Sequence, residues 1–234
     1  MSNIKISGIE KFSMVDYGEK IACTIFTEGC NFRCPFCHNA ALVLPQNKQP
    51  VIPEEEIIDY LTKRKGLVDG VCVTGGEPTL HKGLEEFLVK VKALDYPVKL
   101  DTNGTRPDVI QRLYEKGLID YVAMDIKNSL KKYAFTAGME SLETDKIKQS
   151  TAYLMSSGID YEFRTTLVDG FHDESDIQEI GFWLKGAKQF YLQKFIDSGG
   201  CLSEGLSEVP LEKALSFKRL LLKYIRRVDL RGYA

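Results

Sequence analysis

Residues 20–38 read KIACTIFTEGCNFRCPFCH. The stretch begins with an apolar run containing β-branched side chains, which predicts a buried strand over Lys20–Phe26. Three of the six cysteines of the chain, Cys30, Cys34 and Cys37, follow within eight residues. A strand that leads directly into such a cluster predicts a metal-binding or redox loop at its end.

The same succession of strand and helix recurs along the rest of the chain. Amphipathic stretches separate the apolar runs, and Pro53 followed by three glutamates is typical of a helix start. Alternation of this kind predicts a parallel sheet with right-handed crossovers. We therefore expect an α/β fold, a partial (β/α)6 TIM-like barrel of parallel strands forming a single domain over residues 1–234. The expected strands are Lys20–Phe26, Gly70–Thr74, Pro97–Asp101, Asp120–Asp125, Tyr161–Leu167 and Gln189–Gln193, with a last one over Arg226–Leu230, and further helices are expected near 82–95, 107–117, 143–157, 174–186 and 210–224.

Polar or glycine-rich groups follow strand after strand. Ligands of parallel α/β folds bind at the carboxyl ends of the strands, where the loops converge. We therefore expect these groups to share one edge of the sheet with the cysteines. They are Gly75-Gly76-Glu77-Pro78, Asp101-Thr102-Asn103-Gly104, Asp125-Ile126-Lys127, Arg164 and Gln193.

Composition excludes several classes of protein. The 234 residues carry 31 basic and 33 acidic side chains, a net charge of −2, so no basic surplus indicates a nucleic-acid partner. The longest apolar runs are far shorter than a membrane span, and the first residues lack the apolar core of a signal peptide. We expect a cytoplasmic protein, in which clustered cysteines are metal ligands or redox groups rather than disulfides.

Three thiolates on one loop suit an iron–sulfur cluster. A cubane has four irons, so three cysteines leave one iron open, as a catalytic metal site requires. A zinc site with His38 as fourth ligand is the alternative, although adjacent Cys37 and His38 reach one ion with difficulty.

The spacing C-x3-C-x2-C, with an aromatic residue before the last cysteine, resembles that of the radical S-adenosylmethionine (SAM) enzymes. The strings TEGCNFRCPFCHN, GGEP, DTNG and MDIK are similar to those of the activases of glycyl radical enzymes. Among these, the chain most resembles the activating protein of anaerobic ribonucleoside-triphosphate reductase. The resemblance covers a core of about residues 12–195, with a helix and strand extension over 196–234.

The resemblance implies that Cys30, Cys34 and Cys37 hold one [4Fe–4S] cluster, which binds and cleaves SAM. Gly75, Gly76 and Glu77 then receive the SAM ammonium group. Phe36 lies by the adenine, and His38 orients the cluster loop.

The charged residues at the ends of the middle strands complete the expected site. Asp125 is expected to face SAM. Lys127 and Arg164 are expected to face the SAM carboxylate and ribose hydroxyls, because buried positive charges need partners. Structural ion pairs with Glu77 or Asp101 are the alternative for these two cations. Asp101 and Asp125 would repel each other without a cation between them. Similar activases place a monovalent cation there, which matches Asp101, Thr102 and Asp125.

The implied partners are a glycyl radical enzyme, most similar to anaerobic ribonucleoside-triphosphate reductase, and a low-potential electron donor such as flavodoxin or ferredoxin. Gln193-Lys194-Phe195 stands where pyruvate formate-lyase activases carry a histidine, which disfavours that partner. Alternatives are an activase of another glycyl radical enzyme, a small-molecule enzyme similar to 7-carboxy-7-deazaguanine synthase, and a non-enzymatic metal module. The remaining histidines, His81 and His172, are expected in solvated loops.

Overall fold

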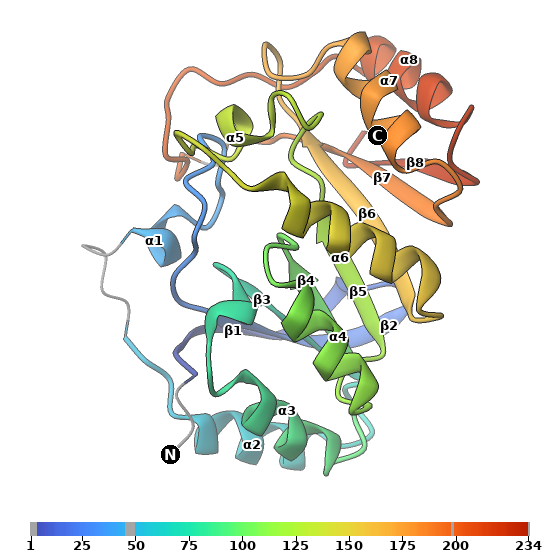
Figure 1. The fold of residues 1–234 in the computed structure, drawn as a ribbon. Coiled ribbons are helices and arrows are strands. Elements are labelled where there is room, and N and C mark those ends of the chain that lie inside the picture. The colour runs from blue at the N-terminus through green and yellow to red at the C-terminus, as the bar shows by residue number, and fades with distance from the viewer. Residues whose placement is uncertain (1–3, 45–49, 198, 234) are drawn as a thin grey trace. The chain divides into compact units, whose positions relative to one another are not determined.

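The computed structural model describes residues 4–44, 50–197 and 199–233. Over these residues the chain forms an α/β fold in which the strands follow one another in chain order along an eight-stranded sheet (Figure 1). The described pairings of β2 with β3, β3 with β4, β6 with β7 and β7 with β8 are parallel, and that of β1 with β2 is antiparallel. The strands are β1 (Ile6–Tyr17), β2 (Lys20–Thr27), β3 (Gly70–Gly75), β4 (Val98–Thr102), β5 (Tyr121–Asp125), β6 (Asp160–Leu167), β7 (Gln189–Lys194) and β8 (Arg227–Arg231).

Helices occupy the stretches between the parallel strands, as the alternating pattern predicted. The α/β fold is confirmed, and each predicted strand corresponds to one of β2 to β8. No helix of the described residues is both long enough and apolar enough to cross a membrane. The helices are α1 (Ala40–Val43), α2 (Glu54–Lys63), the 3₁₀ turn η1 (Pro78–Leu80), α3 (Leu84–Lys92), α4 (Pro107–Glu115), α5 (Tyr133–Thr136), α6 (Thr144–Ser156), α7 (Glu174–Trp183) and α8 (Leu211–Leu221).

Two compact units make up the chain, and the cysteine loop contributes to both. The first comprises the residues up to Asn31 together with Ala41–Ala123. The second comprises Phe32–Ala40 together with the chain from Met124 onward.

In the first unit, β1 and β2 form an antiparallel hairpin, and β2, β3 and β4 continue in parallel. The chain reverses between β1 and β2 at Gly18, whose φ of +58° favours glycine. The sequence did not predict β1. The middle of this strand is exposed and its register is interrupted between Glu10 and Tyr17, so it lacks the apolar alternation by which strands are recognised.

In the second unit, β6, β7 and β8 are parallel, and Arg164 of β6 is the register partner of Tyr191 of β7. Helix α7 begins with a capping box formed by Asp173 and Asp176. Gly181 of this helix packs closely against the ring of Tyr224: a Cβ atom at position 181 would lie 2.6 Å from a ring carbon. Burial of apolar side chains from both helices and strands forms the core of the unit.

Candidate active site

Cys30 belongs to the first unit, while Cys34 and Cys37 belong to the second. In the first unit, the Cys30 sulfur lies 3.9 Å from the side-chain amide nitrogen of Asn103 and 3.9 Å from the side-chain oxygen of Asn31. The same Asn103 nitrogen donates to Asn31 at 2.8 Å. The loop after β4 therefore fixes the residues around Cys30, a role for Asn31 and Asn103 that the sequence analysis did not assign.

Gly75, the last residue of β3, and Gly76 bring the following loop close to the residues before Cys30. Gly75 has a φ of +117°, and a Cβ there would lie 2.3 Å from the Thr27 nitrogen. A Cβ on Gly76 would lie 1.9 Å from the Gly29 carbonyl oxygen, and the Glu77 amide donates to that oxygen at 2.8 Å. Neither position therefore accepts a side chain without moving the backbone.

Glu77, which is 1% exposed, joins the loops after β3 and β4. One carboxylate oxygen accepts from the Thr79 amide at 3.1 Å and from the Thr79 and Thr102 hydroxyls. The other accepts from the Asn103 amide at 2.7 Å. Burial raises the pKa of Glu77, and these donors oppose the rise by stabilising the charged form. The carboxylate fixes the DTNG loop; its predicted contact with the SAM ammonium group stays a prediction.

Replacing Glu77 by Gln is expected to lower the free energy of unfolding by about 2–4 kcal/mol. Each oxygen accepts a backbone N–H, so either orientation of the amide places its NH2 against a donor. Thermal or urea denaturation measures the loss. Glu85→Gln, at a partly exposed ion pair with Arg112, serves as the control and should cost less than about 1 kcal/mol. Equal effects of the two substitutions would contradict this role for Glu77.

Asp101 and Thr102, two of the expected cation ligands, lie at the end of β4. Asp101 is buried and pairs with Lys99 of the same strand, while the Thr102 hydroxyl donates to Glu77 at 2.8 Å. Within the described residues, Asp101 belongs to no group of three or more His, Cys, Asp or Glu side chains that could hold a metal ion. The positive charge beside Asp101 therefore comes from the side chain of Lys99, which belongs to the same unit.

In the second unit, the cysteine loop is held at both of its ends. The Cys37 amide donates to the Cys34 carbonyl at 3.0 Å, which closes a turn. The Arg33 amide donates to Ala137, and Pro35 accepts from the Ser203 amide at 2.9 Å. Contacts to distant segments therefore determine the path of this loop.

Two aromatic contacts fix the remaining predicted residues of the loop. The Phe36 ring meets the edge of Phe171 at a centroid distance of 5.7 Å. His38 stacks on Phe195 at 5.5 Å, and its Nε2 lies 2.9 Å from the Ile196 carbonyl oxygen. This position of His38 fits the predicted role of orienting the loop, because its hydrogen bond and ring contact both go to the segment after β7.

Burial raises the pKa of both thiols in this loop. The positive charge of Lys127 acts against that rise at Cys34 and at Cys37. The net effect is still a raised pKa, so these thiols would give up their protons on binding a metal, because the thiolate is the form that ligates metals.

Asp125, at the end of β5, lies between two cations. Lys127 Nζ is 2.9 Å from one carboxylate oxygen, and Arg164 Nε donates to the other. Burial would raise the pKa of Asp125, but the charges of Arg164 and Lys127 outweigh it and hold that pKa well below its ordinary value. Asp125 in turn raises the pKa of Lys127 against the effect of burial. The sequence analysis placed these three residues at the SAM site, with Glu77 or Asp101 as the alternative partners of the cations, whereas the structure pairs both cations with Asp125.

Buried polar side chains position the backbone of this charged set. Tyr133 donates its hydroxyl to the Asp125 carbonyl at 3.1 Å, and His172 Nε2 lies 2.9 Å from the Lys127 carbonyl. The carbonyl can only accept, so the hydrogen of His172 is assigned to Nε2, and burial lowers the pKa of this residue. The expectation that His172 is solvated is wrong, since it is 2% exposed. The sequence around His172 is polar and loop-like, so it did not indicate the buried contact with the Lys127 carbonyl.

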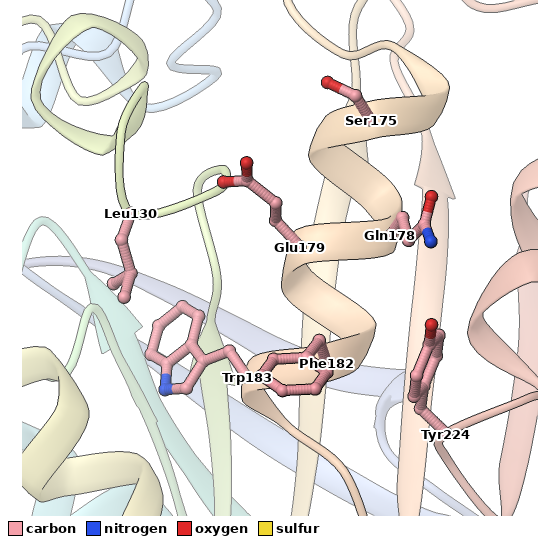
Figure 2. A pocket seen from close by; sticks show the side chains of 7 residues that line it. All are labelled: Leu130, Ser175, Gln178, Glu179, Phe182, Trp183 and Tyr224. Carbon is pink, nitrogen blue, oxygen red and sulfur yellow. The ribbon is translucent and has the colours of Figure 1, made fainter.

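A surface hollow of about 510 Å³ lies beside α7 and contains none of the predicted site residues. Figure 2 shows Leu130, Glu179 and Trp183 on one side of α7 and Gln178 and Tyr224 on the other, with Phe182 near the end of the helix. The Trp183 ring meets Tyr133 edge-on at a centroid distance of 6.3 Å. The hollow therefore adjoins the aromatic support of Asp125 rather than the charged set itself.

Comparison with known families identifies the Radical SAM superfamily as a match over residues 24–183. A protein of Methanocaldococcus jannaschii, provisionally named a glycyl-radical enzyme activating enzyme, is 35% identical over 97% of this chain and 95% of its own length. A GTP 3',8-cyclase of Helicobacter pylori is 30% identical over 52% of this chain but only 35% of that enzyme.

Among solved structures, Streptococcus suis SuiB bound to S-adenosylmethionine matches with a TM-score of 0.69 at 15% identity. The match covers 87% of this chain and 48% of SuiB, so the chain spans about half the length of that protein. A structure of TYW1 matches with a TM-score of 0.58 at 17% identity, over 87% of this chain and 72% of TYW1. At these identities the likeness concerns the fold alone.

Proposed function

Because the chain belongs to the radical SAM superfamily, we propose that it is an activase that forms a glycyl radical on a partner enzyme. One observation carries this proposal: the similarity to the provisionally named activating enzyme extends over 97% of this chain and 95% of that protein. The similarity to the cyclase covers only about a third of the cyclase. A relative of matching length supports the same overall reaction more strongly than a relative matched in one part.

Membership of the superfamily implies a [4Fe–4S] cluster and SAM, and the donor set of the cysteine loop fits them. Cys30, Cys34 and Cys37 form no disulfide, and the charge of Lys127 opposes the rise in pKa that burial causes at Cys34 and Cys37. We assign all three as cluster ligands, which leaves one iron for SAM. The bound cluster supplies the electron for reductive cleavage of SAM.

The chain's own residues would bind SAM and shield it. Asp125 remains charged between Lys127 and Arg164, so this set offers both an acceptor and two donors to the polar groups of SAM. Gly75 and Gly76 allow the loop assigned to the SAM ammonium group to pack directly on the backbone of Thr27 and Gly29. Phe36 would lie by the adenine, and His38 would keep the cluster loop in place.

The partner that we propose is an anaerobic ribonucleoside-triphosphate reductase, with a flavodoxin or ferredoxin as electron donor. The TEGCNFRCPFCHN and DTNG strings support this choice, as does Gln193-Lys194-Phe195 in place of the histidine of pyruvate formate-lyase activases. A glycine suits hydrogen abstraction because its Cα lacks a side chain and is approachable.

The proposal is tested by mixing the reconstituted protein with the reductase, SAM and a strong reductant under anaerobic conditions. We expect a doublet glycyl signal in the electron paramagnetic resonance spectrum. The signal should be absent when the radical-bearing glycine of the reductase is replaced by alanine. A signal obtained only with a different glycyl radical enzyme would change the partner. SAM consumption with a free nucleotide or amino acid, and none with any such enzyme, would overturn the activase function.

A further inference from the structure

Strand β4 carries two opposite charges on one face. Its residues Val98 and Leu100 are 0% exposed and point to one side of the strand, so Lys99 and Asp101 point to the other. Lys99 is only 4% exposed and Asp101 only 9%. Lysine is almost never buried to this extent unless it is paired.

The two side chains are paired with each other. Lys99 Nζ lies 2.5 Å from Asp101 Oδ1, and Cys72 of β3, the register partner of Lys99, lies beside both. The Cys72 sulfur is 3.8 Å from Lys99 Nζ and 3.7 Å from Asp101 Oδ1. Two charges removed from water at this distance are held by their mutual attraction, and loss of one leaves the other buried and uncompensated.

This pair bears on the monovalent cation that the sequence analysis expected at Asp101, Thr102 and Asp125. The cation was needed because two carboxylates ending neighbouring strands would repel each other. Each carboxylate instead has a cationic side chain in its own unit: Lys99 for Asp101, and Lys127 with Arg164 for Asp125. These residues therefore do not fit an additional alkali metal ion.

We propose that the Lys99 ammonium group supplies the positive charge otherwise assigned to a bound monovalent cation, so that this chain binds SAM without an alkali metal ion. An ammonium group and a potassium ion carry the same charge and are of similar size, and both are bound by oxygen atoms. The inference rests on the proposed function in one respect, that SAM binds at the edge of the sheet where β4 ends.

The test measures SAM affinity of the cluster-reconstituted protein in potassium chloride, sodium chloride and choline chloride at equal ionic strength. We expect the wild-type affinity to differ by less than about twofold among the three salts, because the charge is covalently attached. In Lys99→Met, which removes the charge from a side chain of similar length, we expect affinity in choline chloride to fall by about tenfold or more. Potassium should restore most of the lost SAM affinity, because the position of the absent Lys99 ammonium group can then hold an ion.

A second readout uses the cluster-free protein and needs no activity. The melting temperature of Lys99→Met should rise with potassium at constant ionic strength, because an ion that binds only the folded state stabilises it. The melting temperature of the wild type should not. Lys99→Met/Asp101→Asn removes both charges and should abolish the dependence on potassium.

Lys92→Met is the matched control. Lys92 also pairs with an aspartate, Asp120 at 2.9 Å, but its side chain is 27% exposed, so no ion dependence is expected. Wild-type protein that requires potassium or sodium for SAM binding would overturn the proposal, and this result is available even if Lys99→Met fails to fold. Lys99→Met that binds SAM normally in choline chloride would also overturn it. None of these measurements contains a glycyl radical enzyme, so failure of the activase function leaves their outcome unchanged.

Discussion

Replacing Cys34 by alanine is expected to abolish both the cluster and SAM cleavage. Only two of the three assigned ligands, Cys30 and Cys37, would remain, and two irons of a cubane would then lack a protein thiolate. Iron and sulfide analysis after anaerobic reconstitution measures the first effect. Formation of 5′-deoxyadenosine, the nucleoside released by SAM cleavage, measures the loss of SAM cleavage. In the presence of a strong reductant, it should fall to background.

Cys23→Ala provides the control for this substitution. Cys23 lies in β2 with 0% exposure, and burial, with a smaller contribution from Glu10, raises its pKa to about 12. Cys23 lies inside the strand and outside the cysteine loop, so iron content should equal that of the wild type. A Cys34→Ala protein that keeps its iron and cleaves SAM would contradict the ligand assignment. Burial, Asp197 and Cys37 together raise the pKa of Cys201, so Cys201 is electrostatically close to the cysteine loop. A Cys34→Ala/Cys201→Ala protein shows whether Cys201 substitutes as a ligand.

Replacing Asp125 by alanine is expected to weaken SAM binding by about ten- to a hundredfold, while iron content stays unchanged. The carboxylate accepts from both Lys127 and Arg164, and its loss leaves two partly buried cations without their shared partner. A charged hydrogen-bond partner in such a setting contributes about 1.5–3 kcal/mol. Equilibrium dialysis with labelled SAM measures the change, and an affinity within twofold of wild type would contradict the role of Asp125.

The pH dependence of this ion pair has a definite sign. The pKa of Asp125 is held below its ordinary value, so the folded protein keeps the carboxylate charged where an unfolded chain would begin to protonate it. Its contribution to stability is therefore present above the ordinary aspartate pKa of about 3.9 and is lost as the pH falls below it. Between neutral pH and about pH 5, the stability difference between wild type and Asp125→Ala should remain constant.

Most of the fold could be predicted from the sequence because the parallel strands are buried on both faces. The run Gly70–Thr74 is apolar enough to be recognised locally, and Tyr161–Leu167 is recognisable by its aromatic and β-branched residues although it contains Glu162 and Arg164. The hairpin strand β1 could not be recognised, because its exposed middle and shifted register break the alternation. Its place in the fold depends on pairing with β2, which is a tertiary contact.

The candidate site shows the same division between local and tertiary information. Asp125, Lys127 and Arg164 could each be assigned to the SAM site, because two lie in one tripeptide and the third on a strand of fitting parity, but their pairing with one another could not be predicted. The roles of Lys99 and His172 could not be predicted, since each depends on burial and on a partner atom at a particular distance. For Lys99, the available signal was a lysine within an apolar strand, two residues before an aspartate. For His172, the sequence contained no such signal.

The most direct test of the activase function follows the hydrogen atom itself. The reductase is prepared with deuterium at the Cα of its glycines, and 5′-deoxyadenosine formed with the wild-type protein is analysed by mass spectrometry. We expect 5′-deoxyadenosine to gain one deuterium, in step with the growth of the glycyl signal. Unlabelled 5′-deoxyadenosine produced at the same rate with and without the reductase would contradict it.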